Sequence, residues 1–176
     1  MDYNGKVKAT AMVRQLAAIA VLPGVVTLIV PIWIARRNGI VFAVAPDAAG
    51  LALQACGAAV LALGLALFGA SLRQFWTKGR GTLAPWDPPR RFVADGPYRF
   101  VRNPMISGVI FVLTAEALLL QSMPHLEWAA AFAASNVIYI PLVEEPMLEA
   151  RFGDPYREYK RHVRRFLPRL RPWTPR

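Results

Sequence analysis

The chain has 176 residues, of which 55% are hydrophobic, and its formal net charge is +10 at pH 7. The hydrophobic residues occur in long uncharged blocks, whereas a soluble domain distributes them over amphipathic elements. This distribution excludes an ordinary soluble domain and indicates an integral membrane protein. The single cysteine and the two histidines are far apart in sequence, so we predict neither a disulfide framework nor a metal site.

The first two apolar blocks are long enough to cross a membrane. Residues 16–35, LAAIAVLPGVVTLIVPIWIA, carry no charge, and about 20 helical residues span a hydrocarbon layer of roughly 30 Å. A second uncharged block covers residues 48–72, and Gly50, Gly57 and Gly64 recur in it at heptad spacing. We expect these glycines to share one face, where small residues let another membrane helix approach closely.

The third and fourth apolar blocks cover residues 105–123 and 126–143, and only Pro124 and His125 lie between them. This spacing predicts a tight helical hairpin. The four blocks together predict an all-α integral membrane protein with about four transmembrane helices. Glu116 lies inside the third block, and an acid within a span is a functional candidate, here as a catalytic base.

The basic residues concentrate in two segments, residues 73–102 and 151–176, and none lies in the hairpin turn. The positive-inside rule therefore predicts that both segments and both termini are cytoplasmic, in a cytoplasmic (inner) membrane. Arg36 and Arg37 would then face the other side, against the rule. Topology and attraction to anionic headgroups account for the excess charge, so we expect membrane lipids as partners and no nucleic acid.

Two regions follow from this organisation. Residues 1–72 are the N-terminal membrane helices. Residues 73–176 form the predicted functional region, with a cytoplasmic loop, the helical hairpin and a C-terminal amphipathic helix.

A polar segment, GPYRFVRNPMISG, occupies residues 96–108 at the start of the third block. Asn103 is a suitable N-cap, and Pro104 suits the first turn of a helix. The free N–H groups of this helix start favour an anion, and Arg99 and Arg102 add donors for a carboxylate or phosphate.

Adjacent carboxylates, Glu144 and Glu145, end the fourth block. They repel each other and need solvent or cationic partners. The hairpin returns them to the membrane side on which the third block begins. We therefore predict that Glu144 and Glu145 lie near Arg102 and Asn103.

The C-terminal segment has an amphipathic helical pattern. Its apolar residues are Leu148, Phe152, Tyr156, Tyr159, Val163 and Phe166, and basic residues occupy the other face. We expect Gly153 to interrupt the helix, Asp154 to cap its restart and Pro168 to end it, with the apolar face on the membrane surface.

The segment at residues 96–108, followed about forty residues later by EEPMLEARFGDPYREYKRHVRRFLP, resembles the isoprenylcysteine carboxyl methyltransferase and phospholipid methyltransferase family. The resemblance covers roughly residues 74–168. It implies an all-helical membrane enzyme that binds S-adenosylmethionine at the cytoplasmic side and methylates a lipophilic acceptor. The cofactor-binding residues that we predict on this basis are Tyr98, Arg99, Arg102, Asn103, Pro104, Gly108, Glu144, Glu145 and Tyr156. The candidate catalytic residues are Arg102, Glu144, Glu145 and Glu116.

The chain departs from the family pattern at two positions. Asn103 replaces the usual histidine and Ile106 the usual tyrosine, and neither replacement can titrate. Two alternatives therefore stay open, an NADPH-dependent membrane reductase of the sterol reductase type and a non-catalytic membrane scaffold. The acceptor is also open among an isoprenoid carboxylate, a phospholipid amine and a thiol, since apolar pocket walls discriminate weakly.

Overall fold

The computed structural model describes residues 23–74, 77 and 92–174, and all regular elements in these residues are helices. In chain order they are η1 (Val25–Ile29), α2 (Val30–Asn38), α3 (Ala48–Gln74), η3 (Gly96–Arg99), α4 (Pro104–Leu119), α5 (Met123–Tyr139), η4 (Ile140–Glu144), α6 (Glu145–Phe152) and α7 (Asp154–His162). The predicted all-helical fold is confirmed for this part of the chain. Residues 16–22 of the first predicted span and residues 78–91 of the cytoplasmic loop lie outside it.

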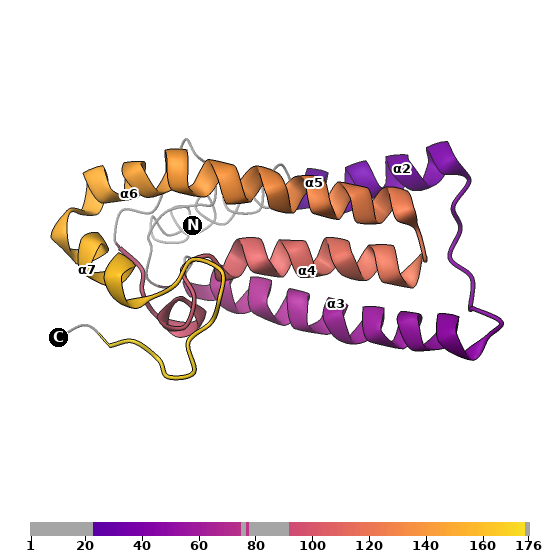
Figure 1. Ribbon diagram of the computed structural model, residues 1–176, viewed down its shortest axis with the longest axis horizontal. Coiled ribbons are helices and arrows are strands. Elements are labelled where there is room, and N and C mark those ends of the chain that lie inside the picture. The colour runs from indigo at the N-terminus through magenta and orange to yellow at the C-terminus, as the bar shows by residue number, and fades with distance from the viewer. Residues whose placement is uncertain (1–22, 75–76, 78–91, 175–176) are drawn as a thin grey trace, which may run out of the picture.

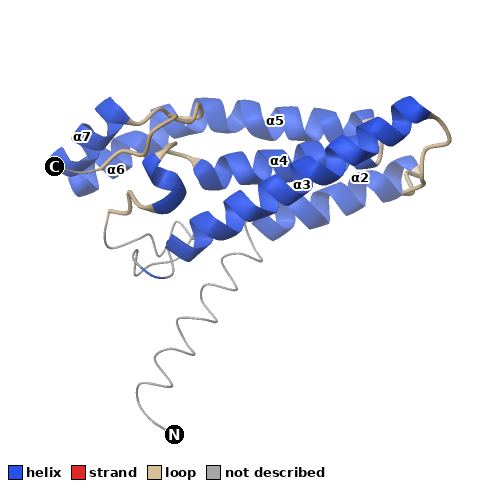
Figure 2. Cartoon of the chain, turned by 90° about the horizontal axis from the view of Figure 1, so that it is seen from below, coloured by secondary structure: helices blue, strands red, loops and turns tan. Residues whose placement is uncertain are grey.

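The long helices run along a common direction (Figures 1 and 2). Helix α4 packs against both α3 and α5, and α2 packs against α5. Helix α5 continues through η4 into α6 without a break, so α6 and α7 lie at the end of the molecule where α4 begins (Figure 1). The helices thereby bring residues 96–104 and residues 144–145 to one end.

Two helical segments are long and apolar enough to cross a membrane, Ala48–Gln74 with 27 residues and Met123–Phe152 with 30. At 1.5 Å per residue, the shorter of these segments is about 40 Å long. Both therefore exceed the thickness of a hydrocarbon layer, which is roughly 30 Å. Helix α4 is apolar but only about 24 Å long at the same rise. Length and composition therefore support two membrane spans. The four crossings that we expected from the sequence stay a prediction.

The predicted glycine face is confirmed, because Gly50, Gly57 and Gly64 of α3 are buried. A Cβ atom added to Gly64 would lie 3.0 Å from the carbonyl oxygen of Gly108 in α4, and one added to Gly108 would lie 2.9 Å from the backbone nitrogen of Phe68. The backbones of α3 and α4 therefore approach at glycine positions, as in other membrane helix pairs. This contact gives Gly108 a packing role.

Replacement of Gly108 by alanine is expected to weaken the α3–α4 contact, because the new methyl group meets backbone that cannot rotate away. Overpacking of this kind costs about 1–3 kcal/mol, which we expect to appear as a lower midpoint of thermal inactivation in detergent. Gly69→Ala in α3 is the matched control, since nothing lies within 4 Å of its added Cβ. Equal losses in the two variants would contradict the close approach at Gly108.

The hairpin turn differs from the prediction. It lies at residues 120–122, where Gln121 has a φ of 47°, and Pro124 and His125 belong to the first turn of α5. Ser122 caps this helix, because its Oγ accepts a hydrogen bond from the His125 backbone at 3.4 Å and lies 2.7 Å from His125 Nδ1. Proline suits the first turn of a helix. Pro124 therefore lies at the start of α5, whereas we expected it in the turn between the two helices.

The C-terminal amphipathic helix also differs from the prediction. Helix α7 begins at Asp154 after Gly153, which has a φ of 60°, and it ends at His162 before Pro168. The following chain turns back, and the backbone N–H groups of Arg169 and Trp173 donate to the carbonyls of Phe100 and Arg99 at 2.9 Å. The apolar face of α7 is buried inside the protein, against residues 92–94 and Trp173, and does not face a membrane surface.

Candidate functional site

Glu145, the first residue of α6, lies at the centre of a charge cluster and is only 2% exposed. Arg165 donates two hydrogen bonds to its carboxylate, from Nε to Oε1 at 2.7 Å and from Nη2 to Oε2 at 3.0 Å. Arg102 Nη1 lies 3.2 Å from Oε1, and Lys160 Nζ lies 3.8 Å from Oε2. We predicted that the two glutamates lie near Arg102, and of the two it is Glu145 that contacts Arg102.

The segment before α4 is tied to the C-terminal segment by backbone. The N–H of Arg102 donates to the carbonyl of Arg164 at 2.9 Å, and the N–H and the side-chain amide of Asn103 both donate to the carbonyl of Arg165. Pro104 is the first residue of α4, as predicted, and Asn103 occupies the N-cap position. The Asn103 side chain does not cap the helix, however, because its amide holds the C-terminal segment in place.

Arg102 has hydrogen-bonding capacity that the described protein atoms leave unused. Its side chain is 9% exposed, and its buried Nε has no hydrogen-bond partner. Tyr156 lies beside it: burial raises the pKa of the Tyr156 phenol to about 12, the Glu145 carboxylate adds to the rise, and Arg102 lowers it. At neutral pH the phenol is protonated, so the cluster offers a guanidinium and a hydroxyl for recognition of an acceptor group.

The second glutamate, Glu144, has a different environment. It ends the π-helical turn η4, is partly buried, and makes no ion pair with another described residue. Burial raises the pKa of Tyr98 well above its usual range, with smaller contributions from Tyr159 and from the Glu144 charge. The paired carboxylates are thus divided into one that anchors cations and one that is available for another group.

Arg99 lies apart from this cluster. Its Nε donates to the carbonyl of Trp173 at 2.7 Å, so the structure gives it a role in fastening the C-terminal segment. The hydroxyl of Tyr159 donates to the carbonyl of Tyr98 at 2.7 Å and fastens α7 to the same region.

The family model for phospholipid methyltransferases matches residues 50–155, which is more than half of the chain. The chain belongs to this family. No curated protein and no solved structure matches it. The family match includes Arg102, Glu144 and Glu145, and identifies a membrane methyltransferase that acts on a lipid substrate.

Glu116 is not brought to the charge cluster of this methyltransferase. It lies near the other end of α4, about 18 Å along the helix axis from Pro104 at 1.5 Å per residue. Its buried Oε2 has no hydrogen-bond partner among the described residues. A direct part in proton transfer at the cluster, as the sequence suggested, is not compatible with this distance.

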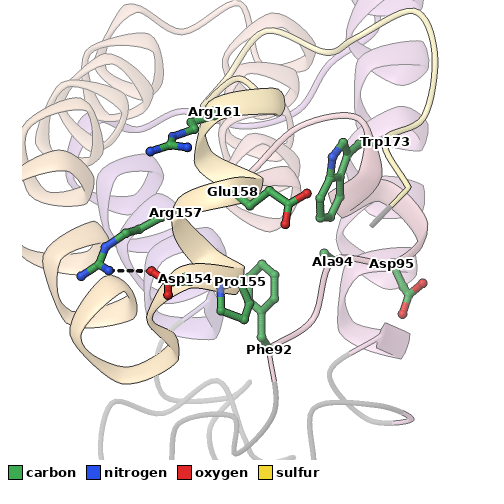
Figure 3. Close-up of a pocket in the computed structure, with 9 residues that line it drawn as sticks. All are labelled: Phe92, Ala94, Asp95, Asp154, Pro155, Arg157, Glu158, Arg161 and Trp173. Carbon is green, nitrogen blue, oxygen red and sulfur yellow. Dashed lines mark hydrogen bonds and ion pairs between the residues drawn. The ribbon is translucent and has the colours of Figure 1, made fainter. Parts of the chain in front are cut away.

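A separate cleft of about 780 Å³ lies between α7, residues 92–95 and Trp173. Figure 3 shows Phe92 beside Pro155 and the Glu158 carboxylate between α7 and Trp173. Its arginines are partly neutralised, because Arg157 Nη1 lies 2.7 Å from Asp154 Oδ1. Arg102, Glu144 and Glu145 do not line this cleft, so it is distinct from the charge cluster.

Sequence reasoning missed two residues of the charge cluster, Lys160 and Arg165, and also Trp173, which fastens the C-terminal segment to Arg99. Lys160 and Arg165 are members of a basic run that the sequence pattern assigned to the polar face of an interfacial helix. Among the described residues no group of three or more histidine, cysteine or acidic side chains is placed to hold a metal ion.

Proposed function

We propose that the chain is an integral membrane methyltransferase that transfers a methyl group from S-adenosylmethionine to a lipophilic acceptor. The observation that carries the proposal is the charge cluster, where the buried Nε of Arg102 has no hydrogen-bond partner in the part of the chain that the structure describes. A buried guanidinium nitrogen without an acceptor is costly, so the site suits a ligand that supplies one. Membership of the family supplies the reaction class.

The described residues fit the polar parts of S-adenosylmethionine. Arg102 and the phenol of Tyr156 are donors for its carboxylate or ribose hydroxyls. Glu144 is an acceptor for its ammonium or for a ribose hydroxyl. Glu145 cannot serve in the same way, because Arg102, Lys160 and Arg165 already surround it, and we assign it to positioning Arg102. When bound, the cofactor supplies a methyl group activated on a sulfonium.

The protein's contribution is then to align donor and acceptor and to exclude water, and no protein nucleophile is required. An isoprenoid carboxylate needs no base, whereas a phospholipid amine or a thiol must first be deprotonated. Glu144 is the carboxylate we assign to that step. Glu145 is held by cations, and Glu116 is too distant.

We also propose that the cluster faces the cytoplasm. The basic residues gather at the end of the molecule where α3 ends, α4 begins and α6 follows the long helix. Cytoplasmic segments of membrane proteins carry such an excess of arginine and lysine. Arg36 and Arg37, at the end of α2, are at the opposite end.

Isothermal titration of the detergent-purified protein with S-adenosylmethionine and S-adenosylhomocysteine tests the proposal. We expect saturable binding that is weakened at least tenfold by Glu144→Gln and by Arg102→Ala, because each removes a charge-assisted hydrogen bond of roughly 1.5–3 kcal/mol. Arg151→Ala is the control, since this arginine is exposed and, among the described residues, contacts the Phe152 ring and not the charge cluster.

Arg102→Ala could lose binding because it misfolds. Glu144→Gln keeps the shape of its side chain, so a loss of binding in that variant reports on the lost charge. Failure of the folded wild type to bind either compound would refute the proposal. Binding of NADPH in its place would indicate the reductase alternative. Binding of neither ligand would indicate a scaffold.

A further inference from the structure

A second cavity, of about 840 Å³, lies between α7 and the chain that follows it. Seven cationic side chains line it: Arg102, Lys160, Arg161, Arg164, Arg165, Arg169 and Arg171. No acidic residue is among its lining residues in the part of the chain that the structure describes. Glu145 neutralises only Arg102, Lys160 and Arg165. The wall of the cavity that Arg164, Arg169 and Arg171 form therefore keeps an uncompensated positive charge.

Arg169 is the clearest sign that this wall is built to receive an anion. Its backbone N–H donates to the carbonyl of Phe100 at 2.9 Å, which fixes its position. Its Nη1 is buried and has no hydrogen-bond partner among the described residues. Arg164 and Arg171 are exposed and make no ion pair with any described residue. A buried guanidinium donor without an acceptor is costly, and a phosphate satisfies several such donors together.

Two leucines indicate where the anion comes from. Leu167 is 65% exposed and Leu170 is fully exposed, and both lie in the segment that forms the cavity wall. The cavity is at the end where α4 begins and the long helix through α5 ends, near the expected membrane surface. Exposed apolar side chains among arginines at this depth are typical of contact with acyl chains and anionic headgroups. A soluble phosphate would leave both leucines in water.

We propose that this cavity binds the phosphate of an anionic phospholipid. Arg164, Arg169 and Arg171 contact the headgroup, and Leu167 and Leu170 contact the acyl chains. The bound lipid holds the segment that also carries Arg165, and so stabilises the surroundings of Glu145 from outside. This lipid is a ligand of the C-terminal segment and not the methyl acceptor, so the inference does not rest on the proposed reaction.

Native mass spectrometry of the detergent-purified full chain tests the site, with phosphatidylglycerol and phosphatidylcholine of the same acyl chains as probes. We expect preferential retention of phosphatidylglycerol. The double variant Arg164→Gln/Arg171→Gln should lose about fivefold in affinity for each charge removed, or about 25-fold in all. Arg36→Gln/Arg37→Gln is the matched control, because it removes two exposed arginines at the opposite end of the helices.

Each other outcome is decisive. Equal losses in the two double variants, or none in either, would overturn the site, because they would show nonspecific charge attraction or no contribution from this wall. Glycerol phosphate that binds as tightly as phosphatidylglycerol would overturn the lipid assignment in favour of a soluble phosphate. Weaker lipid retention in Leu170→Ser, with glycerol phosphate unaffected, would support acyl contact. Because methyl-donor binding is titrated without anionic lipid, failure of one proposal does not imply failure of the other.

Discussion

Replacing Glu145 with glutamine is expected to lower the free energy of unfolding by about 3–5 kcal/mol, as found when one partner of a buried ion pair is removed. The amide keeps the shape of the side chain but not its charge. Arg102, whose side chain is 9% exposed, then keeps a buried positive charge with no carboxylate against it, and Arg165 keeps at most one of its two hydrogen bonds, because the amide offers a single acceptor oxygen. The measurement is thermal inactivation of the protein in detergent, followed by the loss of monodisperse material.

Glu149→Gln is the matched control for this change. Glu149 lies one helical turn further along α6, contacts Lys160 at 3.2 Å and Arg157 at 3.0 Å, and is more exposed than Glu145. Exposed ion pairs contribute little to stability, so we expect a small effect or none. Similar losses of stability in the two variants would show that the burial of Glu145 does not determine how much its ion pairs contribute to the free energy of unfolding.

The part of the site predicted from the sequence is the part fixed by helix topology. Two apolar helices joined by a short turn return the chain to the end of the bundle from which it came. For that reason alone, Glu145 had to come near Arg102. The glycines of α3 were predictable in the same way, because heptad spacing places Gly50, Gly57 and Gly64 on one face.

The part that was missed depends on a long-range return of the chain. Arg165 is 20 residues from Glu145, and Trp173 is 74 residues from Arg99. No periodicity relates such positions, and one arginine in a basic run cannot be told from the next. The same return explains the wrong prediction for α7. A pattern of apolar residues at helical spacing shows that one face is covered but not whether lipid or protein covers it.

Glu144 and Glu145 illustrate what the sequence predicts and what only the structure reveals. Two adjacent carboxylates indicate a site of unusual electrostatics, but they do not reveal which of them is neutralised. The structure places three cations around Glu145 and none around Glu144 among the described residues. Anchoring and ligand recognition are thereby assigned to different residues. We therefore expect substitutions at Glu145 to reduce stability first and substitutions at Glu144 to reduce binding first.

Replacing Trp173 with alanine is expected to release the C-terminal segment from α7. Trp173 is 7% exposed, its ring centroid lies 5.4 Å from that of Tyr159, and its backbone exchanges two hydrogen bonds with Arg99. Loss of a buried tryptophan costs about 3–5 kcal/mol, so trypsin should cleave residues 164–171 much faster in Trp173→Ala than in the wild type. Trp33→Ala is the control, because Trp33 is 57% exposed and should leave the cleavage rate unchanged. Unchanged cleavage in Trp173→Ala would mean that the backbone pairing with residues 99–103 alone holds the segment against Glu145.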